Sequence, residues 1–204
     1  MRCAVFASGG GTNFQTLLDR KDAGNLHVEF VLMVGNNSTA KAFERARAHG
    51  IPAVHIAPSH FDSPGRYTRR LMEVLDEHSV ELILLAGYMK MVPGELVRVY
   101  RNRIINIHPA LLPAFGGKGL YGTRVHQAVL DYGAKLTGVT VHFVDEEYDH
   151  GPVILQQAVE VRDDDDADSL AARVLTVEHD CYWRAVELVA QGKVTVSGRR
   201  VIAA

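Results

Sequence analysis

The sequence predicts an α/β fold: a Rossmann-like, doubly wound, mainly parallel sheet with an antiparallel strand in the C-terminal half. Short apolar segments alternate with amphipathic ones through the first half, which is typical of parallel strands joined by helices. The segment 81–86 is almost continuously apolar, as expected of a parallel strand buried on both faces. In the second half two apolar segments follow each other closely, which favours an antiparallel pair.

The first half alternates strands and helices and ends in a strand that Pro109 stops, since proline cannot donate to a sheet ladder. Gly50 marks the end of one helix, and the helix at 66–78 carries an apolar stripe at helical spacing. A polar loop is expected at 58–64. The expected strands are 2–7, 28–34, 53–56, 81–86 and 104–108, and the expected helices open at 14 and cover 39–49, 66–78 and 94–100.

The second half opens with a glycine-rich loop at 114–122, which we expect to be mobile. The longest helix, 169–191, follows an acidic run whose charges suit a helix N-terminus. Its apolar stripe is Leu170, Val174, Val177, Cys181 and Leu188. The other expected elements are a helix at 123–132, strands at 137–144 and 153–161 around an acidic loop, and a hairpin at 194–202 that turns at Ser197-Gly198. We expect one domain, residues 1–204.

The composition narrows the class of protein. The 204 residues are 47% hydrophobic and 23% charged, which is ordinary for a globular domain. A net charge of -2 does not support binding to nucleic acid or an anionic membrane, and no apolar run approaches the roughly 18 residues of a membrane span. Cys3 and Cys181 lie outside metal or redox spacings, and the N-terminus reads as a strand, not a signal peptide. We therefore expect a cytoplasmic protein, monomeric or homodimeric, that acts on small molecules.

A glycine-rich turn, Ser8-Gly-Gly-Gly-Thr-Asn13, joins the first strand to the first helix. Glycines let the backbone approach an anion, and a helix N-terminus adds free N–H groups and positive dipole. Thr12 and Asn13 are good N-cap residues that could donate to the same anion. The turn lacks the lysine of a P-loop and the third glycine of a dinucleotide fingerprint. A structural turn and a phosphate site are both open readings.

Two polar side chains, Asn106 and His108, lie at the C-terminal end of the strand 104–108. Residues two apart on a strand point the same way, and open α/β sheets place their chemistry at strand carboxyl ends. An amide N–H can stabilise an oxyanion, and an imidazole can do so when protonated or pass on a proton. A carboxylate from 145–149 could orient that imidazole and favour its charged form. A buried pair held by the backbone is the alternative.

The sequence contains no serine or cysteine nucleophile elbow and no metal-ligand spacing. His142 and His150 lie eight apart on different expected elements, which is not a ligand pattern. Direct transfer between two bound substrates is therefore favoured over covalent or metal-assisted catalysis.

Five motifs in order resemble the folate-dependent glycinamide ribonucleotide transformylases, that is, the phosphoribosylglycinamide formyltransferases of purine synthesis. They are Ser8–Asn13, Leu85–Met89, Asn106–Pro113, Gly138–Val144 and Asp149–Gln156. The likeness runs essentially end to end. It implies the formyltransferase fold and transfer of a formyl group from 10-formyltetrahydrofolate, a co-substrate, to the amine of glycinamide ribonucleotide, with no metal.

The resemblance also implies roles for particular residues. Asn106, His108 and Asp149 match the catalytic trio, with Asp149 acting on the imidazole of His108. Matched ribonucleotide-binding residues are Gly11, Thr12 and Asn13 for the phosphate and Glu178 for the glycinamide part. Matched folate-side residues are Met89, Lys90, Met91, Val92 and Asn106, with the Tyr148–Asp149 loop lining the pteridine pocket. His142 matches a position near the site, where structural support is an equal alternative.

Two departures from the family bear on folate binding. A family arginine falls on Pro64, which leaves Arg66 as the nearest candidate for its role. Gly116-Gly-Lys-Gly119 replaces a Pro-Gly turn and lengthens the loop that follows Pro113.

Several other functions compete with this one. A formyltetrahydrofolate hydrolase or a methionyl-tRNA formyltransferase could use the same fold. We expect neither, because the sequence shows no extra N-terminal regulatory domain and no basic C-terminal tRNA-binding domain. A dinucleotide-dependent oxidoreductase and a non-catalytic ligand-binding module are the alternatives from other classes.

Overall fold

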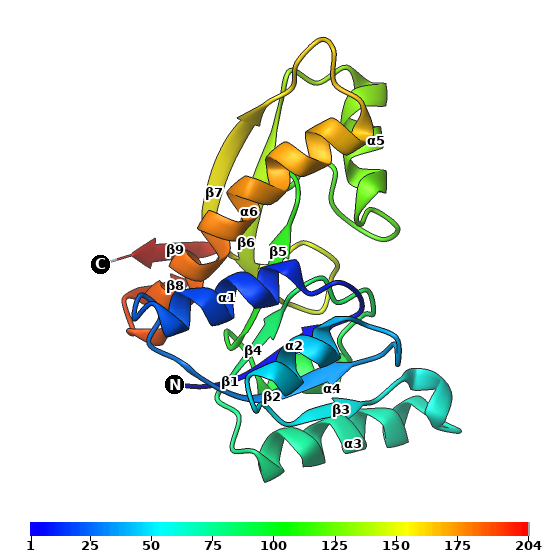
Figure 1. Cartoon of the computed structure of the whole chain (residues 1–204), viewed down its shortest axis with the longest axis vertical. Coiled ribbons are helices and arrows are strands. Elements are labelled where there is room, and N and C mark those ends of the chain that lie inside the picture. The colour runs from blue at the N-terminus through cyan, green and yellow to red at the C-terminus, as the bar shows by residue number, and fades with distance from the viewer. Residues whose placement is uncertain (204) are drawn as a thin grey trace. The chain divides into compact units, whose positions relative to one another are not determined.

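The computed structural model describes residues 1–203 and divides the chain into two compact units, residues 1–105 and residue 106 onward. Each unit contains helices packed on strands (Figure 1). The expectation of a single domain over 1–204 stays a prediction.

The first unit is built on parallel strands in the order β3-β2-β1-β4. The strands are β1 (Arg2–Ala7), β2 (Glu29–Gly35), β3 (Ala53–His55) and β4 (Leu82–Leu85), and β5 (Ile104–His108) begins in this unit. All four residues of β4 are buried, as are Cys3 to Ala7 of β1. Such burial on both faces is what a continuous apolar sequence predicts for a central parallel strand.

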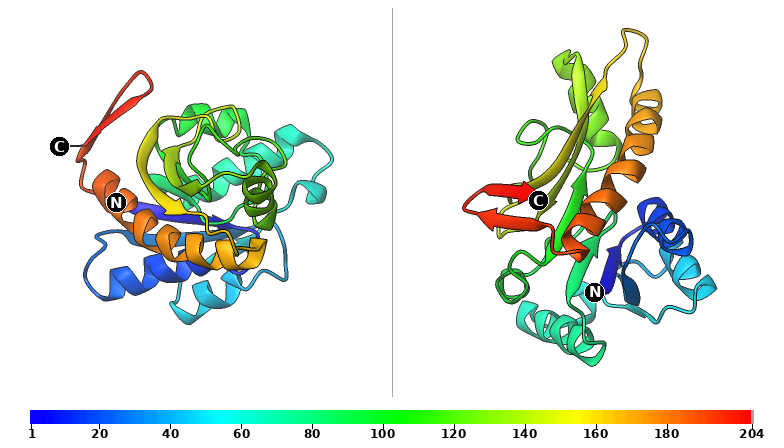
Figure 2. Two further views of the ribbon diagram at one scale, coloured as in Figure 1. Left: turned by 90° about the horizontal axis from the view of Figure 1, so that it is seen from above. Right: turned by 90° about the vertical axis from the view of Figure 1, so that its left-hand side faces the viewer.

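Helices cover both faces of these strands, so the doubly wound α/β arrangement is confirmed. They are α1 (Thr12–Asp22), α2 (Ala42–Ala48), α3 (Pro64–Glu77) and α4 (Gly94–Val99), with a 3₁₀ turn η1 at Pro58–His60. Figures 1 and 2 show α1 and α2 on one face and α3 and α4 on the other.

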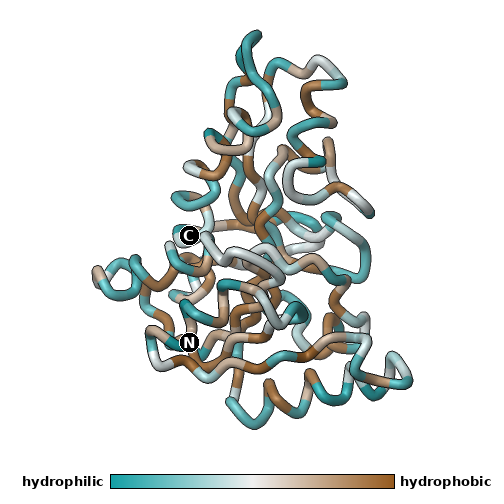
Figure 3. The backbone as a smooth tube through the Cα atoms, turned by 45° about the vertical axis from the view of Figure 1, so that its right-hand side comes forward, coloured by the Kyte–Doolittle hydropathy of each residue, from teal (hydrophilic) through white to brown (hydrophobic). Residues whose placement is uncertain are grey.

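Helix α3 shows how local sequence sets an element's start. It begins two residues earlier than periodicity predicts, because Pro64 suits the first turn and the Ser63 hydroxyl accepts from the Arg66 N–H at 3.4 Å. Apolar and polar residues alternate along it, visible at the foot of Figure 3. Its buried residues are Tyr67, Thr68, Leu71, Val74 and Leu75.

The second unit has strand order β5-β6-β7-β9-β8 and two helices. Its further elements are α5 (Thr123–Tyr132), β6 (Leu136–Phe143), β7 (Val153–Glu160), α6 (Ala167–Ala190), β8 (Val194–Ser197) and β9 (Arg200–Ala203). Strands β6 and β7 pair antiparallel, which confirms the expected antiparallel strand of the C-terminal half. The helix α5 has the predicted bounds, and Gly133 ends it in the left-handed conformation.

Helix α6 packs against α5, β6 and β7 and supplies much of this unit's core. Asp166 caps it, and its carboxylate accepts from the Ser169 N–H at 2.8 Å, so the acidic run does serve the helix N-terminus. Leu170, Val174 and Cys181 are buried as expected, whereas Val177 and Leu188 are only half-buried and Val189 is buried instead.

The expected C-terminal hairpin is present. β8 and β9 pair antiparallel, and Val153 of β7 pairs in parallel with Arg200 of β9. The right-hand view of Figure 2 shows the hairpin, in red, beside β7. Along residues 1–203, no helix is long and apolar enough to cross a membrane.

Gly138 is the tightest point of the β6–β7 pair. A Cβ there would overlap the Gln157 carbonyl oxygen and lie 2.7 Å from Leu111 Cδ2. Gly138→Ala is therefore expected to lower the free energy of unfolding by about 3 kcal/mol, since the paired backbone of β7 cannot move away without breaking the ladder. Urea denaturation measures this change.

Gly65→Ala in α3 is the matched control, because its Cβ would meet nothing within 4 Å. It should leave stability unchanged or raise it by about 0.5–1 kcal/mol. Equal stabilities for the two variants would contradict the close packing described at Gly138.

Candidate active site

Strand β5 carries Asn106 and His108 to a common side. Ile105 and Ile107 point the other way and are buried, which holds the strand in register. Asn106 and His108 both lie near the same carboxylate, that of Asp149, so the predicted common orientation is confirmed. All three residues belong to the second unit.

Asp149 is the hub of this cluster and sits in the 145–152 loop between β6 and β7. Its Oδ1 lies 3.4 Å from Asn106 Nδ2, and its Oδ2 lies 3.6 Å from His108 Nδ1. The Gly117 N–H donates to Oδ2 at 2.9 Å. The backbone at Asp149 has φ 51°, a left-handed conformation that aspartate tolerates better than most residues.

His142 on β6 is a fourth member. Its Nδ1 lies 2.8 Å from the Phe143 carbonyl, which assigns the hydrogen to Nδ1 and leaves Nε2 as an acceptor. Asn106 Nδ2 then donates to Nε2 at 3.1 Å, so His142 orients the amide. The 3.8 Å between Nε2 and Asp149 Oδ1 is too long for a hydrogen bond.

His108 is 3% exposed and its Nε2 lies 2.8 Å from the Phe115 carbonyl. A carbonyl only accepts, so Nε2 carries the hydrogen and Nδ1 faces Asp149 with a lone pair when the ring is neutral. Burial lowers the pKa of His108 below its usual value; Asp149 and the Phe115 carbonyl oppose this, and His142 adds to it. Asp149 raises the pKa of His108, as expected, but the lowering by burial is larger. The resting imidazole is therefore neutral at pH 7.

Asp149 stays ionised. Burial pushes its pKa up, but His142, the nearby His108 and the Gly117 N–H together hold the pKa below the usual value. A carboxylate beside a neutral imidazole is poised to stabilise that imidazole once it takes up a proton.

The loop after Pro113 reaches the cluster through its main chain. Phe115 supplies its carbonyl to His108, and Gly117 supplies its N–H to Asp149. A Cβ at Gly116 would clash with the Leu112 side chain and lie 3.2 Å from Asp149 Cβ. The lack of a side chain at Gly116 thus lets the backbone approach Asp149. Mobility of 114–122 stays a prediction.

The glycine turn of the first unit leads into α1. Gly11 is the N-cap residue, with φ 67°, and no side chain caps the helix. The expectation that Thr12 or Asn13 caps it is therefore wrong: both already lie inside the helix. Thr12 is exposed and Asn13 is buried. The left-handed turn at Gly11 brings the chain close to Ala42, leaving no room for a side chain.

Arg45 on α2 supports the same turn. Its Nε donates to the Gly10 carbonyl at 2.8 Å, and its Nη1 donates to Gln15 Oε1 at 2.7 Å. A guanidinium thus stands beside the start of α1, where the helix dipole is also positive. Sequence reasoning missed Arg45, because a cation on a separate helix has no fixed spacing to the turn it serves.

Ser8 connects this turn to the 87–92 segment. The Ser8 N–H donates to the Gly87 carbonyl at 3.1 Å, and the Met89 N–H donates to Ser8 Oγ at 2.7 Å. In that segment Met89 and Met91 are about half exposed, at 51% and 48%, Lys90 is exposed, and Val92 is buried. Two large exposed apolar side chains, two positions apart in the chain, are available for contact with an apolar ligand.

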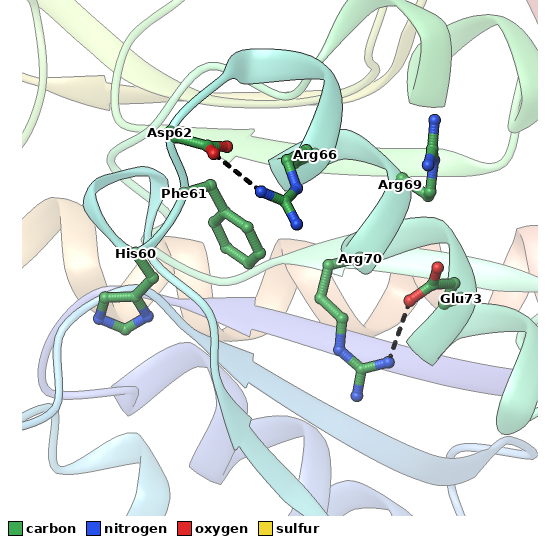
Figure 4. Close-up of a pocket in the computed structure, with 7 residues that line it drawn as sticks. All are labelled: His60, Phe61, Asp62, Arg66, Arg69, Arg70 and Glu73. Carbon is green, nitrogen blue, oxygen red and sulfur yellow. Dashed lines mark hydrogen bonds and ion pairs between the residues drawn. The ribbon is translucent and has the colours of Figure 1, made fainter.

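Arg66 lies beside a cavity of about 550 Å³ on α3 and the turn before it. Figure 4 shows its guanidinium directed at Asp62, with an Nη1–Oδ2 distance of 2.7 Å. Both side chains are 68% exposed, so this pair is loosely held. Arg66 is therefore available to another carboxylate, whereas Arg70 is shared between Glu73 and Glu77.

Glu178 lies on α6, half-buried, in the second unit. Within residues 1–203, His, Cys, Asp and Glu side chains form no group of three arranged to hold a metal ion.

The mixed, mainly parallel sheet flanked by helices is the fold of known formyltransferases. Residues 1–186 match the Formyl transferase family, and the chain belongs to it. It is 39% identical to phosphoribosylglycinamide formyltransferase of Bacillus subtilis, over 88% of this chain and 89% of that protein. It is 44% identical to the chloroplastic enzyme of Arabidopsis thaliana, over 95% of this chain but 66% of that protein, just under two thirds of its length. Glycinamide ribonucleotide transformylase 1 from Symbiobacterium toebii superposes with a TM-score of 0.94 at 39% identity, covering 100% of this chain and 93% of that one.

Proposed function

We propose that the protein transfers a formyl group from 10-formyltetrahydrofolate to the amine of glycinamide ribonucleotide, as a phosphoribosylglycinamide formyltransferase. The observation that carries this is the Asn106–His108–Asp149 cluster, in which His108 is buried and the other two are half-buried, with His142 orienting the amide. Its amide donor, neutral base and adjacent carboxylate suit acyl transfer to an amine. We place the activity in the cytoplasm, on small molecules and not nucleic acid, in a monomer or homodimer.

The proposed binding residues divide by charge and polarity. The turn ending in Gly11, Thr12 and Asn13 takes the ribonucleotide phosphate, where the α1 N-terminus and Arg45 supply positive charge. Glu178 takes the glycinamide part. The exposed faces of Met89 and Met91, with Lys90, Val92 and Arg66, serve the folate.

The proposed reaction starts when the ribonucleotide amine attacks the formyl carbon and the formyl oxygen becomes an oxyanion. The Asn106 amide stabilises that oxyanion. The amine loses a proton to Nδ1 of His108, and the imidazolium formed is held by Asp149. The bond from the formyl carbon to the folate nitrogen then breaks, the oxyanion returns to a carbonyl, and the folate nitrogen takes a proton from His108. The products are formylated ribonucleotide and tetrahydrofolate.

The deciding assay mixes the protein with 10-formyltetrahydrofolate and glycinamide ribonucleotide and follows both products. We expect formylated ribonucleotide in equal amount to tetrahydrofolate, and little tetrahydrofolate when the ribonucleotide is omitted. Tetrahydrofolate release at the same rate without the acceptor would instead indicate a hydrolase. Absence of both products would overturn the proposal.

Gly11→Ala tests the phosphate assignment. The new Cβ would lie 2.9 Å from Ala42 Cβ at a residue with φ 67°, so the turn must shift. We expect the KM for the ribonucleotide to rise about tenfold or more, with a smaller change in the KM for the folate. Steady-state kinetics with each substrate varied in turn measures the split.

Gly10→Ala is the matched control for this change. Gly10 is adjacent and exposed, its φ is not positive, and a Cβ there meets nothing within 4 Å. An equal rise in both substrates' KM values for Gly11→Ala would argue for general disruption instead of a phosphate site.

A further inference from the structure

Arg199, in the turn of the C-terminal hairpin, contacts the residue next to Asp149. Its Nη1 donates to Nε2 of His150 at 2.8 Å, and its Nη2 donates to the His150 carbonyl at 2.6 Å. One guanidinium thus holds both the side chain and the main chain of His150. An arginine fork can make this double contact, whereas a lysine offers a single ammonium.

His150 also contacts Asp145, at the start of the same loop. Its Nδ1 lies 2.7 Å from Asp145 Oδ2, and the other oxygen, Oδ1, accepts from the Glu147 N–H at 3.0 Å. The arrangement fits a neutral imidazole, in which Nδ1 donates to the carboxylate and Nε2 accepts from the guanidinium. Asp145, His150 and Arg199 therefore form a bridge across the 145–150 turn.

The backbone around Asp149 has an uncommon conformation that such a bridge would help to hold. Asp149 is held in the left-handed region, which non-glycine residues adopt seldom. The chain at Gly151 packs so closely on the Phe143 carbonyl oxygen that a Cβ there would overlap it, so the backbone that follows Asp149 lies against the end of β6. The Gly117 N–H holds the carboxylate of Asp149, and Arg199 holds the carbonyl of the next residue, His150.

We propose that Arg199 is a positioning residue for Asp149: the C-terminal hairpin holds the loop so that the Asp149 carboxylate faces His108. The inference deepens the function proposed above, because it concerns the residue assigned to support the base. Asp145 and His150 side chains are 35% and 45% exposed, so the bridge adds little to stability. Its effect should appear in the placement of Asp149.

The first test compares Arg199→Ala with Arg200→Ala, the next residue of the same hairpin, which is also exposed. Arg199→Ala should lower kcat about tenfold, since small displacements of a catalytic group are costly, with an unchanged KM for the ribonucleotide. The Tm should stay close to that of the wild type. Arg199→Lys should recover part of the activity, and Arg200→Ala should behave as wild type.

The second test measures the placement of Asp149 beside His108 without an activity assay. The His108 imidazole titration, followed by NMR, should move to lower pH in Arg199→Ala, because a displaced carboxylate supports the imidazolium less. In an Asp149→Asn background, Arg199→Ala should cause no further movement. If wild type lacked formyl transfer but this shift appeared, the positioning role would stand and the proposed function would fail. An unmoved His108 titration with unchanged kcat, or a loss of activity that follows a loss of Tm, would overturn the inference.

Discussion

Replacing His108 by alanine is expected to reduce kcat for formyl transfer by about 10²–10⁴-fold, the usual contribution of a positioned general base. The Kd for the ribonucleotide should change little, because its proposed phosphate site lies at the start of α1, in the other unit. Steady-state kinetics and calorimetric titration with the ribonucleotide measure the two quantities. Because the imidazole is buried and neutral, what the alanine variant loses is the base that accepts the proton of the amine.

His108→Gln separates chemistry from packing. The Gln side chain can keep an N–H for the Phe115 carbonyl but cannot take up a proton at neutral pH. It should be nearly as inactive as the alanine variant with a Tm nearer the wild type. His27→Ala, at an exposed histidine of the first unit, is the control for losing an imidazole. Near-normal turnover in His108→Ala would remove His108 from the catalytic role.

Asp149→Asn is expected to lower kcat by about 10²-fold and to move the pH–rate profile. The Asp149 carboxylate raises the pKa of His108 against the larger lowering by burial, and an amide cannot do so. The limb of the profile on which His108 becomes the neutral base should therefore move to lower pH. Rates measured from about pH 4 to about pH 9, well to each side of the usual histidine pKa of 6.5, test this.

A stability measurement serves as the companion experiment. The pKa of Asp149 is lowered on folding, so its carboxylate contributes stability above its ordinary pKa of 3.8 that is lost as the pH falls through the lowered value. Asp149→Asn should flatten that acid dependence. An unchanged pH–rate profile together with reduced kcat would remove Asp149 from the titrating pair and leave it an orienting role.

Most elements could be predicted from the sequence because their periodicity reflects burial. Strand β1 has the predicted bounds, and β4 lies within the predicted apolar segment. The orientation of Asn106 and His108 followed from strand alternation alone. Element ends were less predictable: α1 begins at Thr12 because Gly11 adopts a left-handed turn, and that conformation leaves no periodic signal.

The side chains of the candidate site could be predicted from the sequence, but the backbone groups that contact them could not. The sequence could have assigned His142 to the site. Thr140 and His142 are two residues apart on β6, so they share a face, and both are buried polar residues. The Phe115 carbonyl and the Gly117 N–H could not be predicted, since every residue has these groups. The bridge through Arg199 joins segments about 50 residues apart, which no local pattern reports.

The stretch from Phe115 to Gly117 has a consequence for how the gene tolerates change. The Phe115 carbonyl accepts a hydrogen bond from His108, and two residues later the Gly117 N–H donates one to Asp149. Side-chain substitutions at its exposed neighbour Lys118 leave both groups in place. Insertion or deletion of one residue within the stretch would offer each partner a differently placed peptide. Loop length, more than loop composition, would then limit which variants of this enzyme survive selection.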